Sequence, residues 1–519
     1  MQTTIIPHIA MKSSLLLSTD TICALATQPG GAIGVVRVSG NNAISIADAV
    51  FSKSLADSPA NTIHYGEILD GKGQTIDEAV VSLWRAPHSY TGENAVEFSC
   101  HGSAYILEQV LHRLIEAGCR QANPGEFTQR AYFNGKMDLS QAEAVADLIS
   151  STNKASYKMA LSQLKGHFSN ELISLRKELL KMTSLLELEL DFSDHEELEF
   201  ADRTELKTLA QAIDNKVLSL ANSFKTGQAL KKGIPVAIIG KTNVGKSTLL
   251  NQLLRDNRAI VSDIHGTTRD VIEDTMNIKG IDFLFIDTAG IRQTDDRIEQ
   301  IGIERAYEKL QQAQIVLWVI DEEPTDNEKT EIQNRCKDKK LIIVRNKADL
   351  ADSQASDICT NISNREDISS TTECTASATT SIEHISDNAV NKYSTDASLT
   401  SSTPTLEKSE NSSEPAEISI SAKLGYGISA LEQLIYNAAD IPELTENSVI
   451  VTNARHYDAL VNAHDGLTRV IDALNMELSG DLVAEDLKTV IDELGKITGT
   501  QINSEETLHN IFKHFCLGK

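Results

Sequence analysis

Residues 236–247 read Val-Ala-Ile-Ile-Gly-Lys-Thr-Asn-Val-Gly-Lys-Ser, an apolar run followed by a turn that contains glycine and lysine. The apolar run predicts a buried strand, and Leu249 and Leu250 predict a helix directly after the turn. This order is typical of a phosphate-binding loop, because the glycines let backbone N–H groups converge on phosphates at the positive end of a helix. An ordinary glycine turn is the alternative for the segment taken alone.

Later segments supply the other parts of a nucleotide switch. Lys246 is expected to reach the terminal phosphates, and the hydroxyl groups of Ser247 and Thr268 are expected to ligate Mg²⁺. Asp287 ends an apolar run and is expected to hold the metal through water. The N–H group of Gly290 can approach the γ-phosphate because glycine has no side chain.

The segment Asn346-Lys347-Ala348-Asp349 predicts which base is bound. The Asp349 carboxylate matches the paired N–H donors on the edge of guanine, whereas adenine would leave it partly unpaired. A site built on hydrogen bonds discriminates by roughly ten-thousand-fold or more. A second base-contacting loop is predicted at Ser421-Ala422-Lys423, after a strand-like alternation; the rival Ser377-Ala378-Thr379 has no strand pattern before it.

The order of these motifs, on alternating strand and helix patterns, predicts a GTP-binding domain with a parallel sheet and helices on both faces. The predicted GTP-binding residues in these motifs are Asn243, Val244, Gly245, Lys246, Ser247, Thr248, Gly266, Thr267, Thr268, Asp287, Thr288, Ala289, Gly290, Asn346, Lys347, Asp349, Ser421, Ala422 and Lys423.

The chain is long and acidic. Its 519 residues include 74 Asp and Glu against 48 Lys and Arg, and the formal net charge is −26. Any nucleic-acid partner is therefore expected to need a second protein that supplies positive charge. The 7 cysteines are an odd number without a metal-ligand spacing, no apolar run is as long as a membrane span, and no leader pattern is convincing. We expect a cytoplasmic protein with no membrane contact.

The sequence pattern changes along the chain and predicts a multidomain fold. Residues 1–135 mix short strands with an amphipathic helix and predict an α+β domain. Helical periodicity at 136–230 returns at 443–519, which predicts one all-α domain interrupted by an inserted α/β GTP-binding domain at 231–442. The polar residues 351–417 predict a disordered loop within that insertion.

Ile291 follows Gly290, where Ras-like switches carry a glutamine that orients the attacking water. An isoleucine cannot orient water. Either hydrolysis is slow, or another group supplies the orientation and a second positive charge. Arg292 and Arg297 are explained at least as well as solvated helix charges, so no arginine is assigned to this task.

Several short segments are shared with a known family. They are Asp20-Thr21-Ile22, Gly34-Val35-Val36-Arg37-Val38-Ser39-Gly40, Tyr90-Thr91-Gly92-Glu93, Cys100-His101-Gly102, Pro124-Gly125-Glu126-Phe127, Met137-Asp138-Leu139-Ser140-Gln141-Ala142-Glu143, Gly266-Thr267-Thr268-Arg269-Asp270 and Phe515-Cys516-Leu517-Gly518-Lys519. With them the chain resembles the MnmE (TrmE) family of tRNA modification GTPases over almost its whole length. The terminal segment is the most specific of these matches.

The resemblance implies a GTPase that is activated when K⁺ joins the nucleotide domains of two chains, the cation acting in place of an arginine. By family position, Glu299 orients the attacking water through a second water. The residues alone explain Glu299 better as one more acid on a polar helix face. The residues that would surround K⁺ are Asn243, Ser262, Ile264 and Thr267. The resemblance also adds Ser262, Asp263, Ile264 and His265 to the expected GTP-binding residues.

The resemblance also implies that the N-terminal domain binds a one-carbon folate and forms a homodimer. Arg37, Glu97, Lys136 and Lys519 fall where the family contacts 5-formyl- or 5,10-methylenetetrahydrofolate. Arg37 and Lys136 suit the acidic tail or ring carbonyls of a folate, and Glu97 can accept from pterin N–H groups. Cys516 is the candidate reactive thiol, and a small residue at the end of a helix explains it equally well.

The family acts with an FAD-dependent partner, MnmG (GidA), in a hetero-oligomer. Together they add an aminomethyl or carboxymethylaminomethyl group to carbon 5 of the wobble uridine of certain tRNAs. FAD is expected only on the partner, because this chain has no Gly-x-Gly-x-x-Gly fingerprint. The alternatives are an Era/Der-like ribosome-assembly GTPase, for which a basic RNA-binding module is missing, and a regulatory GTP sensor with a structural folate-like domain.

Overall fold

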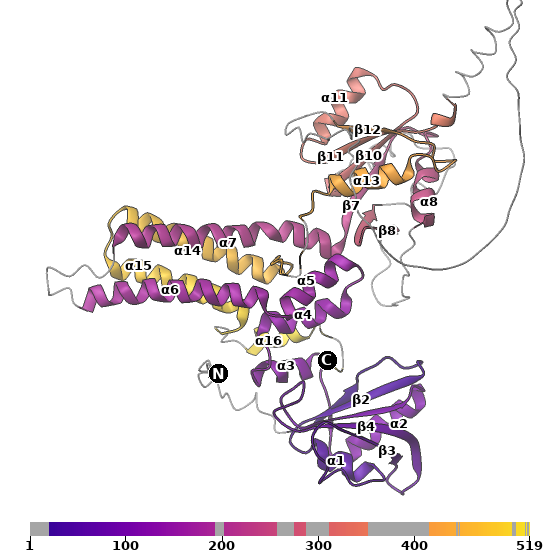
Figure 1. The fold of residues 1–519 in the computed structure, drawn as a ribbon, viewed down its shortest axis with the longest axis vertical. Helices are drawn as coiled ribbons and strands as arrows, with labels where there is room; N and C mark the ends of the chain where they lie inside the picture. Colours follow the sequence, from indigo (N-terminus) through magenta and orange to yellow (C-terminus); the bar gives the residue numbers. More distant parts are fainter. Residues whose placement is uncertain are drawn as a thin grey trace, which may run out of the picture. The chain divides into compact units, whose positions relative to one another are not determined.

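The computed structural model describes residues 20–191, 202–256, 274–286, 311–350, 415–442, 445, 447–500, 505–513, 515 and 518. They divide between two compact units (Figure 1). Unit 1 lies within Met1–Ile234, Lys279–Asp282 and Ile441–Lys519, and unit 2 within Pro235–Ile278 and Phe283–Asp440. The predicted multidomain class, with α+β, all-α and α/β parts, is confirmed. The boundaries at 135/136, 230/231 and 442/443 stay predictions.

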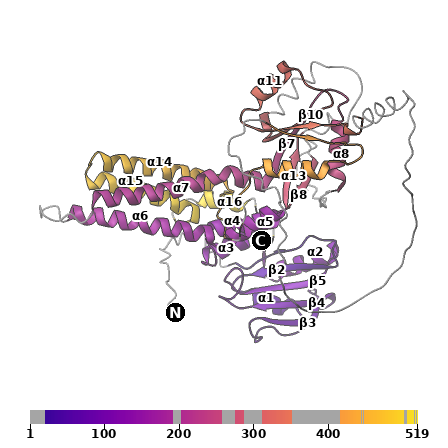
Figure 2. The same cartoon turned by 45° about the horizontal axis from the view of Figure 1, so that its top comes forward.

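The first part of unit 1 is a six-stranded sheet with strand order β3-β4-β5-β2-β1-β6 (Figure 2). Its elements are β1 (Ile22–Leu25), β2 (Ile33–Ser39), α1 (Ala43–Val50), β3 (Thr62–Leu69), β4 (Thr75–Trp84), β5 (Ala95–His101), α2 (Ala104–Glu116) and β6 (Arg120–Gln121). Residues alternate between buried and exposed along β4, and the buried ones join α1 and α2 in one core. β2 pairs with β5 antiparallel, and the register sets Arg37 opposite Glu97.

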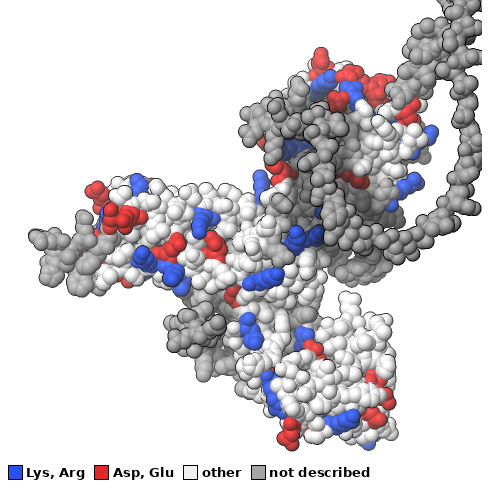
Figure 3. Space-filling view, viewed as in Figure 1, with Lys and Arg blue, Asp and Glu red and all other residues white. Residues whose placement is uncertain are grey.

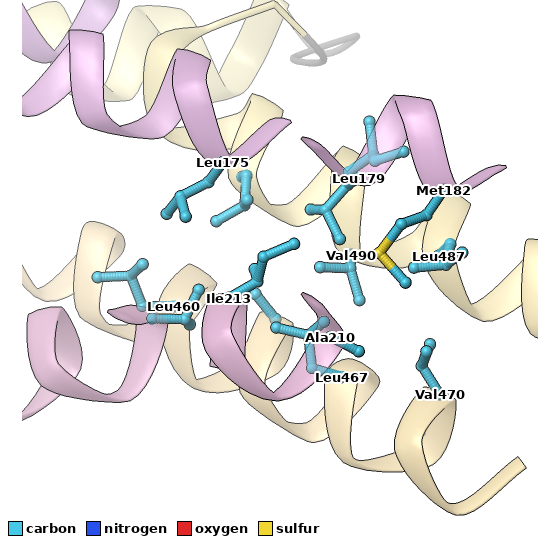
Figure 4. Packing of buried hydrophobic residues seen from close by; sticks show 14 of the residues in the cluster. Leu175, Leu179, Met182, Ala210, Ile213, Leu460, Leu467, Val470, Leu487 and Val490 are labelled. Atoms are coloured by element: carbon cyan, nitrogen blue, oxygen red, sulfur yellow. The ribbon is translucent and has the colours of Figure 1, made fainter. Parts of the chain in front are cut away.

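The helical part of unit 1 is assembled from two separate stretches of chain. The first contains α3 (Glu126–Phe133), α4 (Leu139–Ser150), α5 (Lys154–Leu164), α6 (His167–Asp191) and α7 (Arg203–Lys232), and the second α14 (Ala454–Asn475), α15 (Gly480–Thr498) and α16 (Glu505–Phe512). Buried residues of α6 and α7, such as Leu179 and Ile213, share one core with Leu467 and Val490 of α14 and α15 (Figure 4). Neither stretch buries its apolar face without the other.

Unit 2 is built on a six-stranded sheet with strand order β12-β11-β10-β7-β9-β8. Its elements are β7 (Ile234–Ile239), α8 (Lys246–Asp256), β8 (Asp274–Ile278), β9 (Ile281–Phe285), β10 (Ile315–Ile320), α11 (Asp326–Arg335), β11 (Lys340–Arg345), β12 (Ala416–Ser419) and α13 (Ile428–Ala438). Strands β7, β10, β11 and β12 are parallel, so their carboxyl ends meet at one edge of the sheet. Ligands of such sheets bind at that edge.

The predicted disordered loop ends earlier than residue 417. Ala416 and Glu417 already belong to β12, where they pair with Ile342 and Ile343 of β11. This edge strand is largely exposed, so its composition resembles that of a loop. Residues 351–414, to which the rest of the prediction applies, lie outside the described residues. No helix in the described part of the chain is long and apolar enough to cross a membrane.

Candidate functional sites

The predicted phosphate loop connects β7 to α8. At Gly245 the backbone has φ 96°, and a Cβ there would lie 2.2 Å from Nδ2 of Asn346, so only glycine fits. Asn243 also has a positive φ, 63°. The N–H group of Leu249 donates to the carbonyl oxygen of Gly245 at 2.9 Å, which begins the hydrogen bonding of α8 at the loop. The loop therefore ends at a helix N-terminus, where anions are stabilised.

Lys246 folds its side chain back over the same loop. Its Nζ donates to the carbonyl oxygens of Gly240 at 2.7 Å and Lys241 at 2.6 Å. Burial lowers the pKa of Lys246. Ser247 is half-buried, and Thr248 and Asn243 are exposed. The ammonium group of Lys246, which is predicted to bind phosphate, is thus held at the loop by two backbone carbonyl oxygens. Phosphate oxygens can take the place of these carbonyl oxygens as its hydrogen-bond acceptors.

Asn346 joins the phosphate loop to the predicted base-recognition loops. Its side chain is buried, its Nδ2 donates to the carbonyl oxygen of Val244 at 2.8 Å, and its Oδ1 accepts from the N–H group of Ala422 at 2.9 Å. Its own N–H group donates to the carbonyl oxygen of Ile320 at 2.8 Å. One amide therefore connects segments that lie far apart in the sequence.

The predicted guanine-recognition residues lie in contact with one another. The hydroxyl group of Ser421 donates to Oδ1 of Asp349 at 2.6 Å, which orients the carboxylate. Lys347 has φ 66°, and its Nζ lies 2.7 Å from Oδ2 of Asp321. Lys423 is exposed. The structure thus places Ser421-Ala422-Lys423 beside Asn346 and Asp349, although contacts to a nucleotide stay predictions.

Many predicted residues lie outside the described residues. In unit 2 they are Ser262, Asp263, Ile264, His265, Gly266, Thr267, Thr268, Asp287, Thr288, Ala289, Gly290 and Glu299, and at the C-terminus they are Cys516 and Lys519. Ser377-Ala378-Thr379 also lies outside them. Their roles at the nucleotide and one-carbon sites stay predictions.

A second candidate site is a pocket of about 220 Å³ in the N-terminal part of unit 1. It is lined by Arg37, Ser39, Trp84, Tyr90, Thr91, Ala95 and Glu97. Nε of Arg37 donates to Oε1 of Glu97 at 2.7 Å, and the guanidinium carbon lies 5.6 Å from the ring centre of Tyr90. The pocket thus combines a cation, a carboxylate and aromatic side chains, which suits a flat polar ligand with N–H donors.

The C-terminal tail reaches this pocket. Nη1 of Arg37 donates to the carbonyl oxygen of Gly518 at 3.0 Å. Gly518 has φ 85° and packs so closely on β1 that a Cβ there would lie 2.1 Å from the carbonyl oxygen of Leu25. Phe512 and Phe515 pack with Leu139 in a small core just before the end of the chain. The backbone of the tail therefore contacts Arg37, one of the residues that line the pocket.

Lys136 does not line the pocket. Its Nζ donates to the carbonyl oxygen of Pro87 at 3.1 Å. Sequence reasoning had not singled out Trp84, and it had named Tyr90 only within a shared segment. Trp84 carries no local signal, since a tryptophan at the end of a strand is ordinarily a packing residue.

Family models match nearly the whole chain. The model for the MnmE helical domain matches residues 139–516, and the model for the N-terminus of the GTP-binding protein TrmE matches residues 21–136. The chain is 48% identical to a tRNA modification GTPase MnmE of Bacteroides fragilis, over 97% of this chain and 100% of that protein. It is 49% identical to the protein of that name from Parabacteroides distasonis, over 96% of this chain and 100% of that protein.

Proposed function

The chain belongs to the MnmE family of tRNA modification GTPases, and from that premise we propose that it is a K⁺-activated GTPase working with a flavoprotein. With an FAD-dependent partner of the MnmG (GidA) type, it adds an aminomethyl or carboxymethylaminomethyl group to carbon 5 of the wobble uridine of certain tRNAs. The observation that carries the GTPase part is the Asn346 side chain, which joins the phosphate loop to the guanine loop. The Era/Der-like alternative is set aside by the family membership.

The loop after β7 fits a nucleotide with its metal ions. Lys246 would contact the terminal phosphates, Ser247 and Thr268 would hold Mg²⁺, and Asn243, Ser262, Ile264 and Thr267 would hold K⁺. When bound, these cations neutralise charge that develops on the phosphate oxygens. Asn243 supports this role, because it is exposed on the loop and its amide oxygen is a ligand of the kind that K⁺ takes.

Replacing K⁺ by Na⁺ is expected to lower GTP turnover by at least about ten-fold, because a second positive charge at the transition state contributes about 10³ to 10⁵ in GTPases. Glu299→Ala should suppress hydrolysis in K⁺ while leaving GTP binding nearly intact. The measurement is steady-state phosphate release in matched KCl and NaCl. The control is Glu322→Ala, which removes an exposed acid of unit 2. Comparable slow turnover in both salts would reject the K⁺ mechanism and favour a GTP sensor.

The pocket at Arg37 and Glu97 fits a one-carbon folate, with Lys136, Lys519 and Cys516 as further proposed groups. The paired Arg37 and Glu97 can hold acceptors and donors of a pterin ring, and Tyr90 offers a ring face. A bound folate would supply the one-carbon unit for the tRNA. We also propose a homodimer through the N-terminal part and a cytoplasmic location, which the unpaired thiols of Cys23, Cys100, Cys119 and Cys336 support.

Gly518→Ala is expected to weaken binding of 5-formyltetrahydrofolate by roughly ten-fold or more, because hydrogen bonds to charged groups contribute about 1.5–3 kcal/mol. The added Cβ overlaps the carbonyl oxygen of Leu25 and moves the tail away from Arg37. The measurement is calorimetric titration of the full chain with the folate. Gly73→Ala is the matched control, since Gly73 has φ 80° but nothing within 4 Å of its Cβ position. If Gly518→Ala and Gly73→Ala bind 5-formyltetrahydrofolate with equal affinity, Gly518 does not contribute to the folate site.

A further inference from the structure

The turn between β8 and β9 groups with unit 1, although its two strands belong to the sheet of unit 2. Residues Lys279–Asp282 fall in unit 1, and β8 and the rest of β9 fall in unit 2. Lys279 and Gly280, which separate the two strands, have φ 52° and 86°. Two central residues with positive φ are typical of the two-residue type I′ turn, which joins paired strands tightly. The hairpin is therefore a short connection between the nucleotide-binding sheet and unit 1.

This turn packs on the first residues of α5. The N–H group of Ala155 donates to the carbonyl oxygen of Gly280 at 3.1 Å. N–H groups in the first turn of a helix have no acceptor within the helix, so the hairpin supplies one. A Cβ at Gly280 would lie 2.8 Å from Cβ of Lys154, which leaves no room for a larger residue in the turn. The backbone of the turn is therefore in direct contact with the start of α5.

Asp282 brings a buried carboxylate to this contact. Figure 3 shows Asp and Glu side chains at the surface, where water solvates them, whereas Asp282 is 7% exposed in an otherwise apolar strand. Its Oδ2 accepts from the hydroxyl group of Thr152 at 2.9 Å and from Nδ2 of Asn153 at 2.8 Å. Burying a carboxylate is costly unless such donors replace water. Asp282 is therefore stabilised within β9 by donors at the start of α5.

Asn153 uses both polar atoms of its side chain. Its Oδ1 accepts from the N–H group of Ser156 at 2.8 Å and caps α5, while its Nδ2 donates to Asp282. Nδ2 also lies 3.5 Å from the carbonyl oxygen of Leu230, near the end of α7, and α7 leads into β7 and the phosphate loop. Capping alone does not require an amide, because serine or aspartate caps a helix equally well. The NH₂ group of Asn153 therefore serves the contact with the hairpin.

The hairpin lies between predicted switch residues in the sequence. Thr268, a predicted Mg²⁺ ligand, precedes β8, and Asp287 follows β9. Both residues lie outside the described part of the chain. A nucleotide that acts on them acts on two strands whose common turn is held at α5.

We propose that Asp282 and Asn153 are a positioning pair that couples the nucleotide state of the chain to α5. GTP shifts β8 and β9, and the pair makes the start of α5 follow the turn. The hairpin cannot withdraw from α5 without leaving a buried carboxylate short of its donors, so turn and helix move together. Coupling between sites typically changes an equilibrium by about 5- to 150-fold. The proposal rests on the proposed function for its output, which is modification of the tRNA.

Three variants of the full chain separate this role from helix capping. Asn153→Ser keeps a capping oxygen but is too short to reach Asp282, and Asn153→Asp keeps the cap but sets two carboxylates against each other. Asn153→Asp combined with Asp282→Asn restores an amide and a carboxylate with their places exchanged. The matched control is Asn453→Ser, because the side chain of Asn453 caps α14 by accepting from the N–H group of Arg455 at 2.9 Å.

The first measurement is hydrogen exchange of the α5 amides, at pH 8, with GDP and with a non-hydrolysable GTP analogue. In the wild-type chain, exchange rates in Lys154–Leu164 should differ between the two nucleotides by roughly five-fold or more. The difference should disappear in both single variants of Asn153, return in the double variant and stay in Asn453→Ser. The proposal is overturned if wild-type α5 does not respond to the nucleotide, if the single variants respond like the wild type, or if the double variant does not recover.

The second measurement is the number of modified wobble uridines per GTP hydrolysed, with the flavoprotein partner in KCl. Asn153→Ser should lower this ratio roughly ten-fold, and the double variant should restore it. GTP turnover should stay near the wild-type value, because the phosphate loop is unchanged. Turnover and modification that fall together would indicate a loss of stability and would overturn the proposal. If α5 responds to the nucleotide as expected but the wild-type chain modifies no tRNA, the proposed function fails and the coupling stands.

Discussion

Asp349→Asn is expected to lower the affinity of the chain for GTP by roughly ten-thousand-fold, the largest effect of any single change considered for the nucleotide site. Guanine offers N–H donors from its ring nitrogen and its amino group, and a carboxylate accepts both. The asparagine amide offers one acceptor and one donor group, so its NH₂ group then faces an N–H donor of guanine in a desolvated position. The measurement is the Kd of a fluorescent GTP analogue.

A nucleotide with a different base distinguishes a loss of base recognition from a loss of folding in Asp349→Asn. Xanthine has a carbonyl group in place of the guanine amino group, so the asparagine amide can donate to it. The variant should therefore bind xanthosine triphosphate better than GTP. Ser421→Ala removes the hydroxyl group that holds Asp349 and should cost about 1 kcal/mol of GTP affinity. Asp326→Asn, on the exposed helix α11, is the control. Unchanged GTP affinity in Asp349→Asn would show that another residue selects the base.

Glu143→Ala is expected to lower the free energy of unfolding of unit 1 by about 3–5 kcal/mol, the cost typical of removing one partner of a buried ion pair. Burial by itself would raise the pKa of Glu143, but His456 and Arg455 outweigh burial and lower that pKa to about 2. Both partners lie on α14, with Nη2 of Arg455 and Nε2 of His456 each 2.7 Å from Oε2 of Glu143. The variant would leave buried His456 without its carboxylate partner, while Arg455 would keep only the carbonyl oxygens of Lys496 and Ile497.

The lowered pKa also fixes the direction of the pH dependence. The pKa of Glu143 in the unfolded chain is about 4.3, so its contribution is complete above that pH and is lost as the pH falls toward 2. Wild-type unit 1 should lose on the order of 3 kcal/mol through this group between about pH 5 and pH 2. In Glu143→Gln this acid-dependent part should be missing from denaturant unfolding curves.

The control for Glu143 is an exposed ion pair between α14 and α15. Nε of Arg469 lies 3.0 Å from Oδ1 of Asp486, with side chains 53% and 31% exposed. Asp486→Ala should change the free energy of unfolding by about 0–1 kcal/mol, because solvent screens such pairs. If Glu143→Ala and Asp486→Ala lower the free energy of unfolding by similar amounts, burial does not make the Glu143 ion pair more stabilising than an exposed one.

The nucleotide site is predicted from local sequence pattern alone. The glycine turn after β7 and the segment 346–349 each have a residue pattern typical of nucleotide-binding loops. Such a pattern is recognised without knowing which other segment of the chain lies beside it. The same holds for the fold class, since apolar periodicity follows from the geometry of strands and helices. The end of the polar insertion was misplaced at 417, because the exposed strand β12 is recognised only by its pairing with β11.

The sequence by itself determined the family and the fold class, and it predicts a phosphate loop and a guanine-recognition loop between two helical stretches. Only the tertiary structure decided which distant groups meet: Asn346 with Val244 and Ala422, Arg37 with Glu97 and Gly518, and Glu143 with α14. The physical reason is that these contacts depend on strand register and on helix packing across hundreds of residues. Neither strand register nor helix packing can be read from the local spacing of residues along the chain.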